Sequence, residues 1–255
     1  MPSLGCGPGE PGARFMVAPA IIVRTVSSAV PPPEGHDVTA GDDLLAGQLA
    51  YYRRRAGEYD VTAYPDPDAA RARITRIMAT LRPAGKVLEI ACGTGAWTAA
   101  LAEAAATVTA IDAAPEMIDI ARGRVTAANV RFEVADVFTW QAAAWFDTIF
   151  FAFWLSHVPA SRFGQFWRQL RALVTGHGRV LFVDEHPDAR GKEDYAAGSD
   201  EIIHRRLGDS SEHRLVKVFI HPAQLQARLR QLGWQSRTHR DGDDWVIGEA
   251  RPANP

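Results

Sequence analysis

Short apolar runs alternate with segments of helical periodicity through the middle of the sequence, and this alternation constrains the fold more than any other feature. The apolar runs cover residues 86–91, 107–111, 130–134, 148–153 and 179–183. Strands that are apolar along nearly their whole length belong to sheets covered on both faces, and helices between parallel strands provide that cover. The sequence therefore predicts an α/β fold with a doubly wound, Rossmann-like and mostly parallel sheet.

The two ends of the chain depart from this pattern. Residues 1–40 are rich in proline and glycine and predict a flexible N-terminal extension. Residues 41–82 are compatible with helices, and residues 187–220 form a polar insertion that is longer than an ordinary connection. The apolar runs on either side of the Asp-Gly-Asp-Asp turn at 241–244 predict a hairpin, and so an antiparallel edge strand at the C-terminal end of the sheet. We expect one domain over residues 41–255.

The composition limits the class of partner. Hydrophobic residues make up 47% of the chain, and 28 basic side chains stand against 30 acidic ones, which argues against disorder and against nucleic-acid binding. A small-molecule partner fits better. The chain has two cysteines, Cys6 and Cys92, which predicts a reducing, cytoplasmic location without a disulfide framework. No apolar run is long enough for a bilayer span, so no membrane partner is expected, and a homodimer is left open.

The stretch Val-Leu-Glu-Ile-Ala-Cys-Gly-Thr-Gly at 87–95 leads from the first apolar run into a turn of small residues. In an open parallel sheet, ligands bind beyond the carboxyl ends of the strands, and Gly93 and Gly95 would let a ligand approach the backbone there. A phosphate-binding P-loop is excluded because the turn lacks its lysine. A nicotinamide-dependent oxidoreductase is an alternative, although Thr98 stands where the dinucleotide fingerprint has its third glycine.

The segment from Glu89 to Gly95 resembles the acidic-x-Gly-x-Gly-x-Gly signature of the class I S-adenosylmethionine-dependent methyltransferases, with Ala91 in place of the first glycine. Ile111-Asp112, Ala135-Asp136-Val137 and the apolar run that ends at Phe153 follow in the order of that family. The resemblance implies S-adenosylmethionine (SAM) as cofactor and transfer of a methyl group to oxygen, carbon or nitrogen of a small molecule by in-line displacement.

The resemblance also assigns roles along the chain. It implies that Glu89 and the backbone of the glycine turn hold the methionine end of the cofactor, that Asp112 accepts hydrogen bonds from the ribose hydroxyls, and that Asp136 and Val137 lie beside the adenine. A carboxylate that follows a strand can also cap the next helix, and this alternative applies to Asp112. The further cofactor contacts implied by the resemblance are Tyr51, Ala91, Gly93, Gly95, Trp97, Ala113, Met117 and Phe153.

The acceptor side is predicted from the ends of the fourth and fifth strands. The segment at 154–159 lacks the Asn/Asp-Pro-Pro-aromatic signature of base-methylating relatives, so a nucleic-acid base is disfavoured as acceptor. An imidazole can act as a general base near neutral pH, which makes His157 and then His186 the candidate catalytic residues. For His157, the alternative is a histidine that caps a helix or bridges backbone groups. Trp154 and Glu185 are expected to contact the substrate. No metal ligands with suitable spacing are found.

The tyrosine-rich stretch Ala-Tyr-Tyr-Arg-Arg-Arg-Ala-Gly-Glu-Tyr-Asp at 50–60 resembles the helix that covers the cofactor in small-molecule methyltransferases. Residues 41–82 are therefore expected to form a helical lid, and Tyr59 and Arg55 to face the substrate. A solvated amphipathic helix is the alternative for this stretch. For the whole chain, a non-catalytic protein that binds the cofactor is the second alternative, besides the oxidoreductase.

Overall fold

A computed structural model of the chain describes residues 38–142 and 144–253. The extension predicted over residues 1–40 lies almost entirely outside the described residues. The first helix, α1 (Val38–Arg55), begins slightly before the predicted domain start. Among the described helices, none is both long and apolar enough to cross a membrane.

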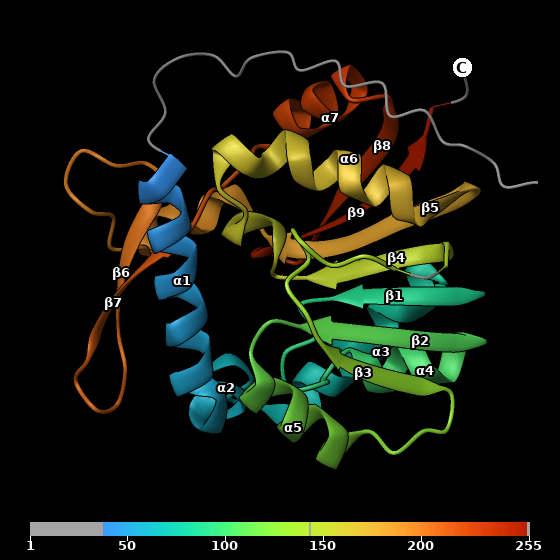
Figure 1. The fold of residues 1–255 in the computed structure, drawn as a ribbon, viewed down its shortest axis with the longest axis horizontal. Helices are drawn as coiled ribbons and strands as arrows, with labels where there is room; N and C mark the ends of the chain where they lie inside the picture. Colours follow the sequence, from blue (N-terminus) through green and yellow to red (C-terminus); the bar gives the residue numbers. More distant parts are fainter. Residues whose placement is uncertain (1–37, 143, 254–255) are drawn as a thin grey trace, which may run out of the picture. The chain divides into compact units, whose positions relative to one another are not determined.

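A seven-stranded sheet with the order β3-β2-β1-β4-β5-β9-β8 forms the centre of the domain (Figure 1). The first five strands run parallel, as predicted. The hairpin β8–β9 completes the sheet: β9 pairs antiparallel with β5, and β8 forms the edge and pairs antiparallel with β9. The strands are β1 (Lys86–Ile90), β2 (Thr107–Asp112), β3 (Val130–Val134), β4 (Phe146–Ala152), β5 (Val174–Glu185), β8 (Trp234–Asp241) and β9 (Trp245–Pro252).

Helices cover both faces of this sheet, which explains the apolar strands. On one face α3 (Pro67–Leu81), α4 (Thr98–Ala104) and α5 (Pro115–Arg124) bury side chains such as Ile77 and Leu101 against β1 and β2. On the other face α6 (Phe163–Leu173) and α7 (Pro222–Gln231) bury Trp167 and Leu229. The fold predicted from the alternation is confirmed.

A second, two-stranded sheet lies outside this sandwich. It is formed by β6 (Ile202–Arg206) and β7 (Glu212–Val216) within the predicted insertion, after the short helix η4 (Pro187–Lys192). Figure 1 shows α1 beyond the carboxyl ends of the central strands, with this hairpin along its other side. Tyr51 of α1 packs with Ile203 and Leu215 of the hairpin, so the insertion and α1 form one unit.

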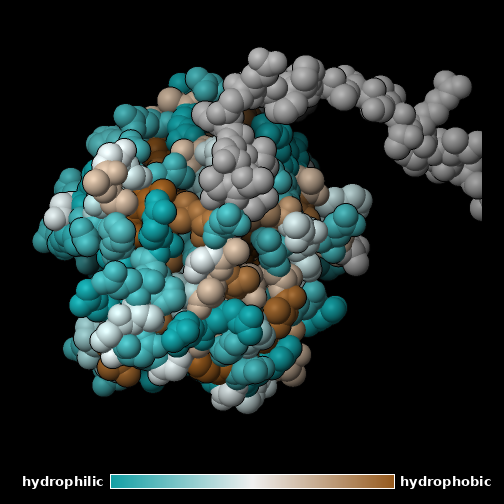
Figure 2. All heavy atoms as spheres, turned by 60° about the vertical axis from the view of Figure 1, so that its left-hand side comes forward, coloured by the Kyte–Doolittle hydropathy of each residue, from teal (hydrophilic) through white to brown (hydrophobic). Residues whose placement is uncertain are grey.

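The region predicted as a lid separates into two parts. Helix α1, η1 (Ala56–Glu58) and α2 (Tyr59–Ala63) extend along the ends of the strands, whereas α3 belongs to a layer that covers the sheet. Figure 2, viewed from the side of α1 and the hairpin, shows mostly hydrophilic side chains on this face with smaller apolar areas between them. Arg53 and Arg54 of α1 are exposed, and they pair with Glu116 of α5 and Asp209 of the hairpin turn.

Candidate active site

A cavity of about 510 Å³ opens at the carboxyl ends of β1, β2 and β4 and is closed over by α1. This is the edge of the sheet at which the sequence places the site. Of the residues predicted from the sequence, the cavity is lined by Ala91, Gly93, Asp112, Ala113, Met117, Asp136, Val137, Phe153, Trp154, His157 and Tyr59.

The turn after β1 has the backbone that a close ligand needs. Gly93 and Gly95 have φ angles of 55° and 80°, in the left-handed region. A Cβ atom at Gly93 would meet nothing within 4 Å, whereas one at Gly95 would lie 3.1 Å from the Ala121 side chain. Gly93 therefore leaves room for a ligand, and Gly95 allows α5 to approach. Ala91, which stands where the family signature has its first glycine, also takes a left-handed φ of 53°. The backbone of the turn is therefore the one that a glycine would favour, although the residue is an alanine.

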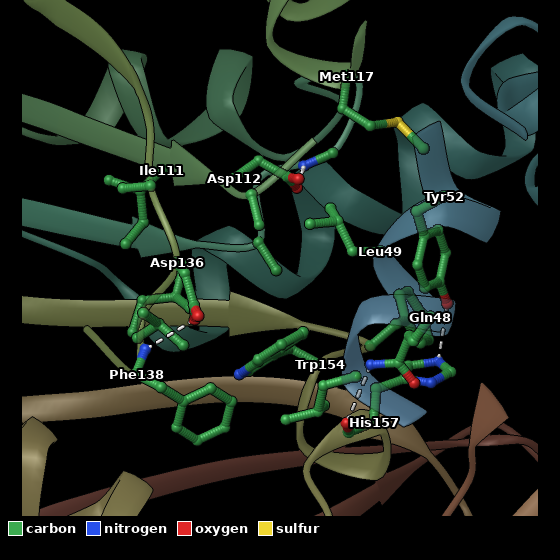
Figure 3. Close-up of a pocket in the computed structure, with 18 of the residues that line it drawn as sticks. Gln48, Leu49, Tyr52, Ile111, Asp112, Met117, Asp136, Phe138, Trp154 and His157 are labelled. Carbon is green, nitrogen blue, oxygen red and sulfur yellow. Dashed lines mark hydrogen bonds between the residues drawn. The ribbon is translucent and has the colours of Figure 1, made fainter. Parts of the chain in front are cut away.

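Asp112 and Asp136 lie on the same side of the cavity as the glycine turn (Figure 3). Asp112 accepts hydrogen bonds from the backbone N–H groups of Gly93 at 2.9 Å and Ala114 at 2.8 Å. Burial raises the pKa of Asp112, and these two N–H groups oppose the rise. Asp136 accepts from the N–H of Phe138 at 2.9 Å. Each carboxylate thus bonds to its own loop, Asp112 also bonds to the turn after β1, and both still have oxygen lone pairs for ligand hydroxyl or amino groups.

Glu89 and Trp97 lie beneath the glycine turn and do not line the cavity. The Glu89 carboxyl is 2% exposed and accepts a hydrogen bond from the Thr98 hydroxyl at 2.6 Å. Burial raises the pKa of Glu89 to about 8, so this side chain is largely protonated at neutral pH. Trp97 packs against Phe150 and Phe153. Both residues therefore support the turn from behind.

The opposite side of the cavity is formed around His157, in η2 (Leu155–His157) after β4. Its Nδ1 lies 2.7 Å from the carbonyl oxygen of Val216, and because a carbonyl only accepts, Nδ1 carries the proton. Nε2 therefore offers a lone pair, to which the Tyr52 hydroxyl donates at 3.1 Å (Figure 3). Burial, and then the nearby Lys217, hold the pKa of His157 well below its usual value. The imidazole is neutral at neutral pH.

The helix turns Tyr52, and not Tyr51, toward the cavity. Tyr51 was the residue expected there from the sequence, but it is 3% exposed and faces the β6–β7 hairpin, because adjacent residues of a helix point in different directions. Arg55, expected at the substrate, stacks over Tyr59 at 4.7 Å and donates to Thr62 without lining the cavity.

The structure places His186 and Glu185 away from the cavity. His186 precedes η4, where its Nδ1 accepts the N–H of Asp188 at 3.3 Å, so it caps this short helix. Glu185 pairs with the buried Lys217 at 2.8 Å. The catalytic prediction for His186 and the substrate contact predicted for Glu185 have no support in this geometry.

Gln48 of α1 lines the cavity beside His157 and was missed from the sequence. Its side chain is 4% exposed and bonds both to the His157 carbonyl and to the Val216 N–H. The sequence contains one weak indication that Gln48 belongs to the site. It falls between Leu45 and Leu49 on the apolar stripe of the helix, and both leucines line the cavity.

The residues present fit SAM. Trp154 lines the cavity and adds an aromatic face to its wall. The glycine turn, Asp112 and Asp136 provide room and acceptors for an adenosyl group, and Met117, Phe138 and Phe153 provide an apolar wall. Among the described side chains there is no cluster of three potential metal ligands.

Comparisons with known proteins agree with this geometry. A family model described as a methyltransferase domain matches residues 87–178. A ubiquinone biosynthesis O-methyltransferase of Xanthomonas axonopodis pv. citri (strain 306) is 33% identical over 169 residues, which cover 64% of this chain and 68% of the relative.

Among solved structures, DhpI in complex with S-adenosylhomocysteine (SAH), the product that SAM leaves after methyl transfer, superposes with a TM-score of 0.73 at 38% identity. The match covers 83% of this chain and 98% of that chain. A Burkholderia thailandensis 1,6-didemethyltoxoflavin-N1-methyltransferase shares the fold, with a TM-score of 0.60, 20% identity and coverage of 87% and 94%. The glycine turn, the two carboxylates and these relatives lead to one conclusion: the chain belongs to the class I SAM-dependent methyltransferases and acts on small molecules.

Proposed function

We propose that the enzyme methylates the oxygen of an acidic hydroxyl group, phenolic or enolic, on a small planar acceptor. The observation that carries this proposal is the Tyr52–His157 pair: the imidazole is neutral, and its unprotonated Nε2 lies 3.1 Å from a tyrosine hydroxyl at the cavity wall. The name of the O-methyltransferase relative from Xanthomonas supports oxygen as the atom methylated.

The bound cofactor supplies an electrophilic methyl group on a sulfonium. The chain's own residues orient the acceptor and take its proton. In the proposed reaction the acceptor oxygen forms a bond to the methyl carbon as the bond from sulfur to that carbon breaks. The hydroxyl proton passes to the Tyr52 oxygen, and the Tyr52 proton passes to Nε2 of His157. Burial raises the pKa of Tyr52, so the phenol relays a proton and does not remain ionised.

The acidity of the acceptor follows from His157. Because its pKa is low, the imidazole is a weak base, and proton transfer to it is efficient only from a hydroxyl that is itself acidic. A phenol, whose pKa is about 10, meets this condition better than an alkyl alcohol. Phe138, Phe153, Trp154 and Tyr59 on the cavity wall suit a flat aromatic or conjugated ring.

The test is a panel of matched phenols, anilines and benzyl alcohols, incubated with the full chain and methyl-labelled SAM. We expect label in the phenol ethers at neutral pH. Label only in the anilines or only in the benzyl alcohols would refute oxygen transfer to an acidic hydroxyl. Calorimetric titration with SAH beforehand establishes that the cofactor binds, so a silent panel is assigned to the acceptor and not to the cofactor.

Three further features are proposed from the composition alone: a cytoplasmic location, the absence of a nucleic-acid partner, and a homodimer as an open alternative to the monomer. Light scattering of the purified chain measures the oligomeric state directly, and a monomer at all concentrations would remove the homodimer.

A further inference from the structure

A closed cycle of three hydrogen bonds joins α1, η2 and β7 behind the candidate base. The Gln48 amide donates to the carbonyl oxygen of His157 at 3.2 Å and accepts the N–H of Val216 at 3.0 Å. The Val216 carbonyl in turn accepts the Nδ1–H of His157 at 2.7 Å. Each of the three residues therefore contacts the other two, and Figure 3 shows the Gln48 side chain directed at His157.

This cycle includes Nδ1 of His157, the ring nitrogen whose proton decides that Nε2 keeps its lone pair. Val216 selects the tautomer by accepting from Nδ1, and the tautomer leaves the lone pair on Nε2. Val216 can do so only while β7 stays at its present distance from η2. The Val218 N–H, just after β7, donates to the Ser156 carbonyl at 2.7 Å and joins these two segments directly, and Gln48 adds a second link that bonds to His157 and Val216 themselves. An amide is suited to this task because it carries both a donor and an acceptor. Gln48 touches neither ring nitrogen, so it acts through its two neighbours.

The charged groups around the imidazole do not replace this function. Lys217 of the segment after β7, Arg205 of β6 and Arg55 of α1 act on His157 through their charge. Lys217 pairs with Glu185 and bonds to the Ser156 hydroxyl at 3.2 Å, and Arg205 pairs with Glu193. These cations favour the neutral ring but do not distinguish Nδ1 from Nε2, whereas the hydrogen-bond cycle does.

We infer that Gln48 is a positioning residue for the methyl transfer: by linking α1 to both His157 and Val216, it holds the imidazole in the tautomer that leaves the Nε2 lone pair for the Tyr52 hydroxyl at the cavity wall. The inference rests on the proposed role of His157 as the proton acceptor. Helix α1 also brings Leu45, Leu49 and Tyr52 to the cavity wall, so the same helix lines the cavity and positions the base.

The test compares Gln48→Met, which has a similar shape but no hydrogen bonds to give, with Arg54→Gln. The control breaks the ion pair between Arg54 and Asp209, another contact between α1 and the hairpin, which is exposed and distant from His157. Nitrogen-15 NMR of the SAH-saturated chain reports the protonation of each ring nitrogen, and a His157→Gln sample assigns the signal. We expect a single Nδ1–H tautomer in the wild type and in Arg54→Gln, and a mixture of tautomers in Gln48→Met.

The kinetic expectation for Gln48→Met is a kcat about tenfold lower, with the KM for SAM changed by less than about threefold, because a base out of position affects the chemical step. In a His157→Gln background the same change should lower kcat by less than about twofold, since residues that act as one unit are not additive. Gln48→Glu keeps the acceptor for the Val216 N–H but has no N–H to donate to the His157 carbonyl, so it should also give a mixture of tautomers and a lower kcat. It replaces Gln48→Met in both measurements if the latter does not fold.

An unchanged tautomer in Gln48→Met would overturn the inference, and so would a full additional loss of kcat in the His157→Gln background. Failure of the proposed function has a different signature. If His157→Gln retains full activity, His157 is not the proton acceptor, and the NMR comparison still decides whether Gln48 fixes the ring.

Discussion

The cavity wall around Asp112 and Asp136 comes from loops that directly follow neighbouring strands, whereas the wall around His157 comes from segments that are far apart in the sequence. On the first side the carboxylates bond to backbone N–H groups two positions away or in the adjacent turn. On the second side Tyr52, Gln48 and Val216 meet His157 or each other across 105, 109 and 168 residues. The cofactor side is thus set by local sequence and the acceptor side by tertiary packing. Substitutions on the cofactor side should lower the affinity for SAH, and substitutions on the acceptor side should lower kcat.

The largest expected effect is on the cofactor side. Asp112→Ala removes the acceptor proposed for the ribose hydroxyls and should lower kcat/KM for SAM about 1,000-fold, since two charge-assisted hydrogen bonds are lost. It also leaves the N–H groups of Gly93 and Ala114 without their partner. Calorimetry with SAH measures the affinity. Asp119→Ala, on the exposed side of α5, is the matched control and should bind as the wild type does. Equal affinities for the two variants would contradict the assignment.

On the acceptor side, His157→Gln should lower kcat about 100-fold because general base catalysis is lost, while the affinity for SAH stays within about threefold. Initial rates with a saturating acceptor and calorimetry measure these quantities separately. His186→Gln is the control, because His186 lies outside the cavity, and its kcat should match that of the wild type. A loss of SAH affinity in His157→Gln as large as the loss in kcat would show that the two sides are not separate.

The same contrast explains which features the sequence could predict. Periodicity predicts the strands, and the residues at the carboxyl ends of the first three strands predict where the site lies. The position of Gly93, Asp112 and Asp136 at the cavity wall could therefore be anticipated. Helical periodicity places Leu45, Leu49 and Tyr52 on one face, which favours Tyr52 over Tyr51, but the sequence does not show that this face meets the cavity and the Tyr51 face meets the hairpin. The role of Gln48 could not be predicted either. Its two partners, the His157 carbonyl and the Val216 N–H, come together only through the packing of β7 against η2.

Glu89 sharpens the comparison through its dependence on pH. Its pKa is about 8 in the folded chain, above that of an ordinary glutamate, so the folded state keeps a proton that the unfolded state releases. The stability from this group is therefore full at low pH and is lost as pH rises toward 8. Relative to Glu89→Gln, the free energy of unfolding of the wild type should fall by about 1 kcal/mol per unit between about pH 5 and pH 7. Urea unfolding of both proteins across this range gives the difference, and parallel curves would show that Glu89 is ionised in the fold.

The smallest effect concerns the strain in the turn at Ala91. A left-handed conformation costs an L-residue about 1–2 kcal/mol, and glycine costs about 0.5–1 kcal/mol in unfolded-state entropy, so Ala91→Gly should raise the free energy of unfolding by about 0.5–1 kcal/mol. Ala113, on the same cavity wall, is not among the described residues with positive φ, and Ala113→Gly should lower stability by a similar amount. Urea unfolding without cofactor measures both. If both variants lose stability equally, the turn stores no strain at Ala91, and the alanine is as suited to this position as glycine. If Ala91→Gly gains stability but binds SAH more weakly, the methyl group contributes to the ligand wall, and the alanine is retained for binding at the expense of the fold.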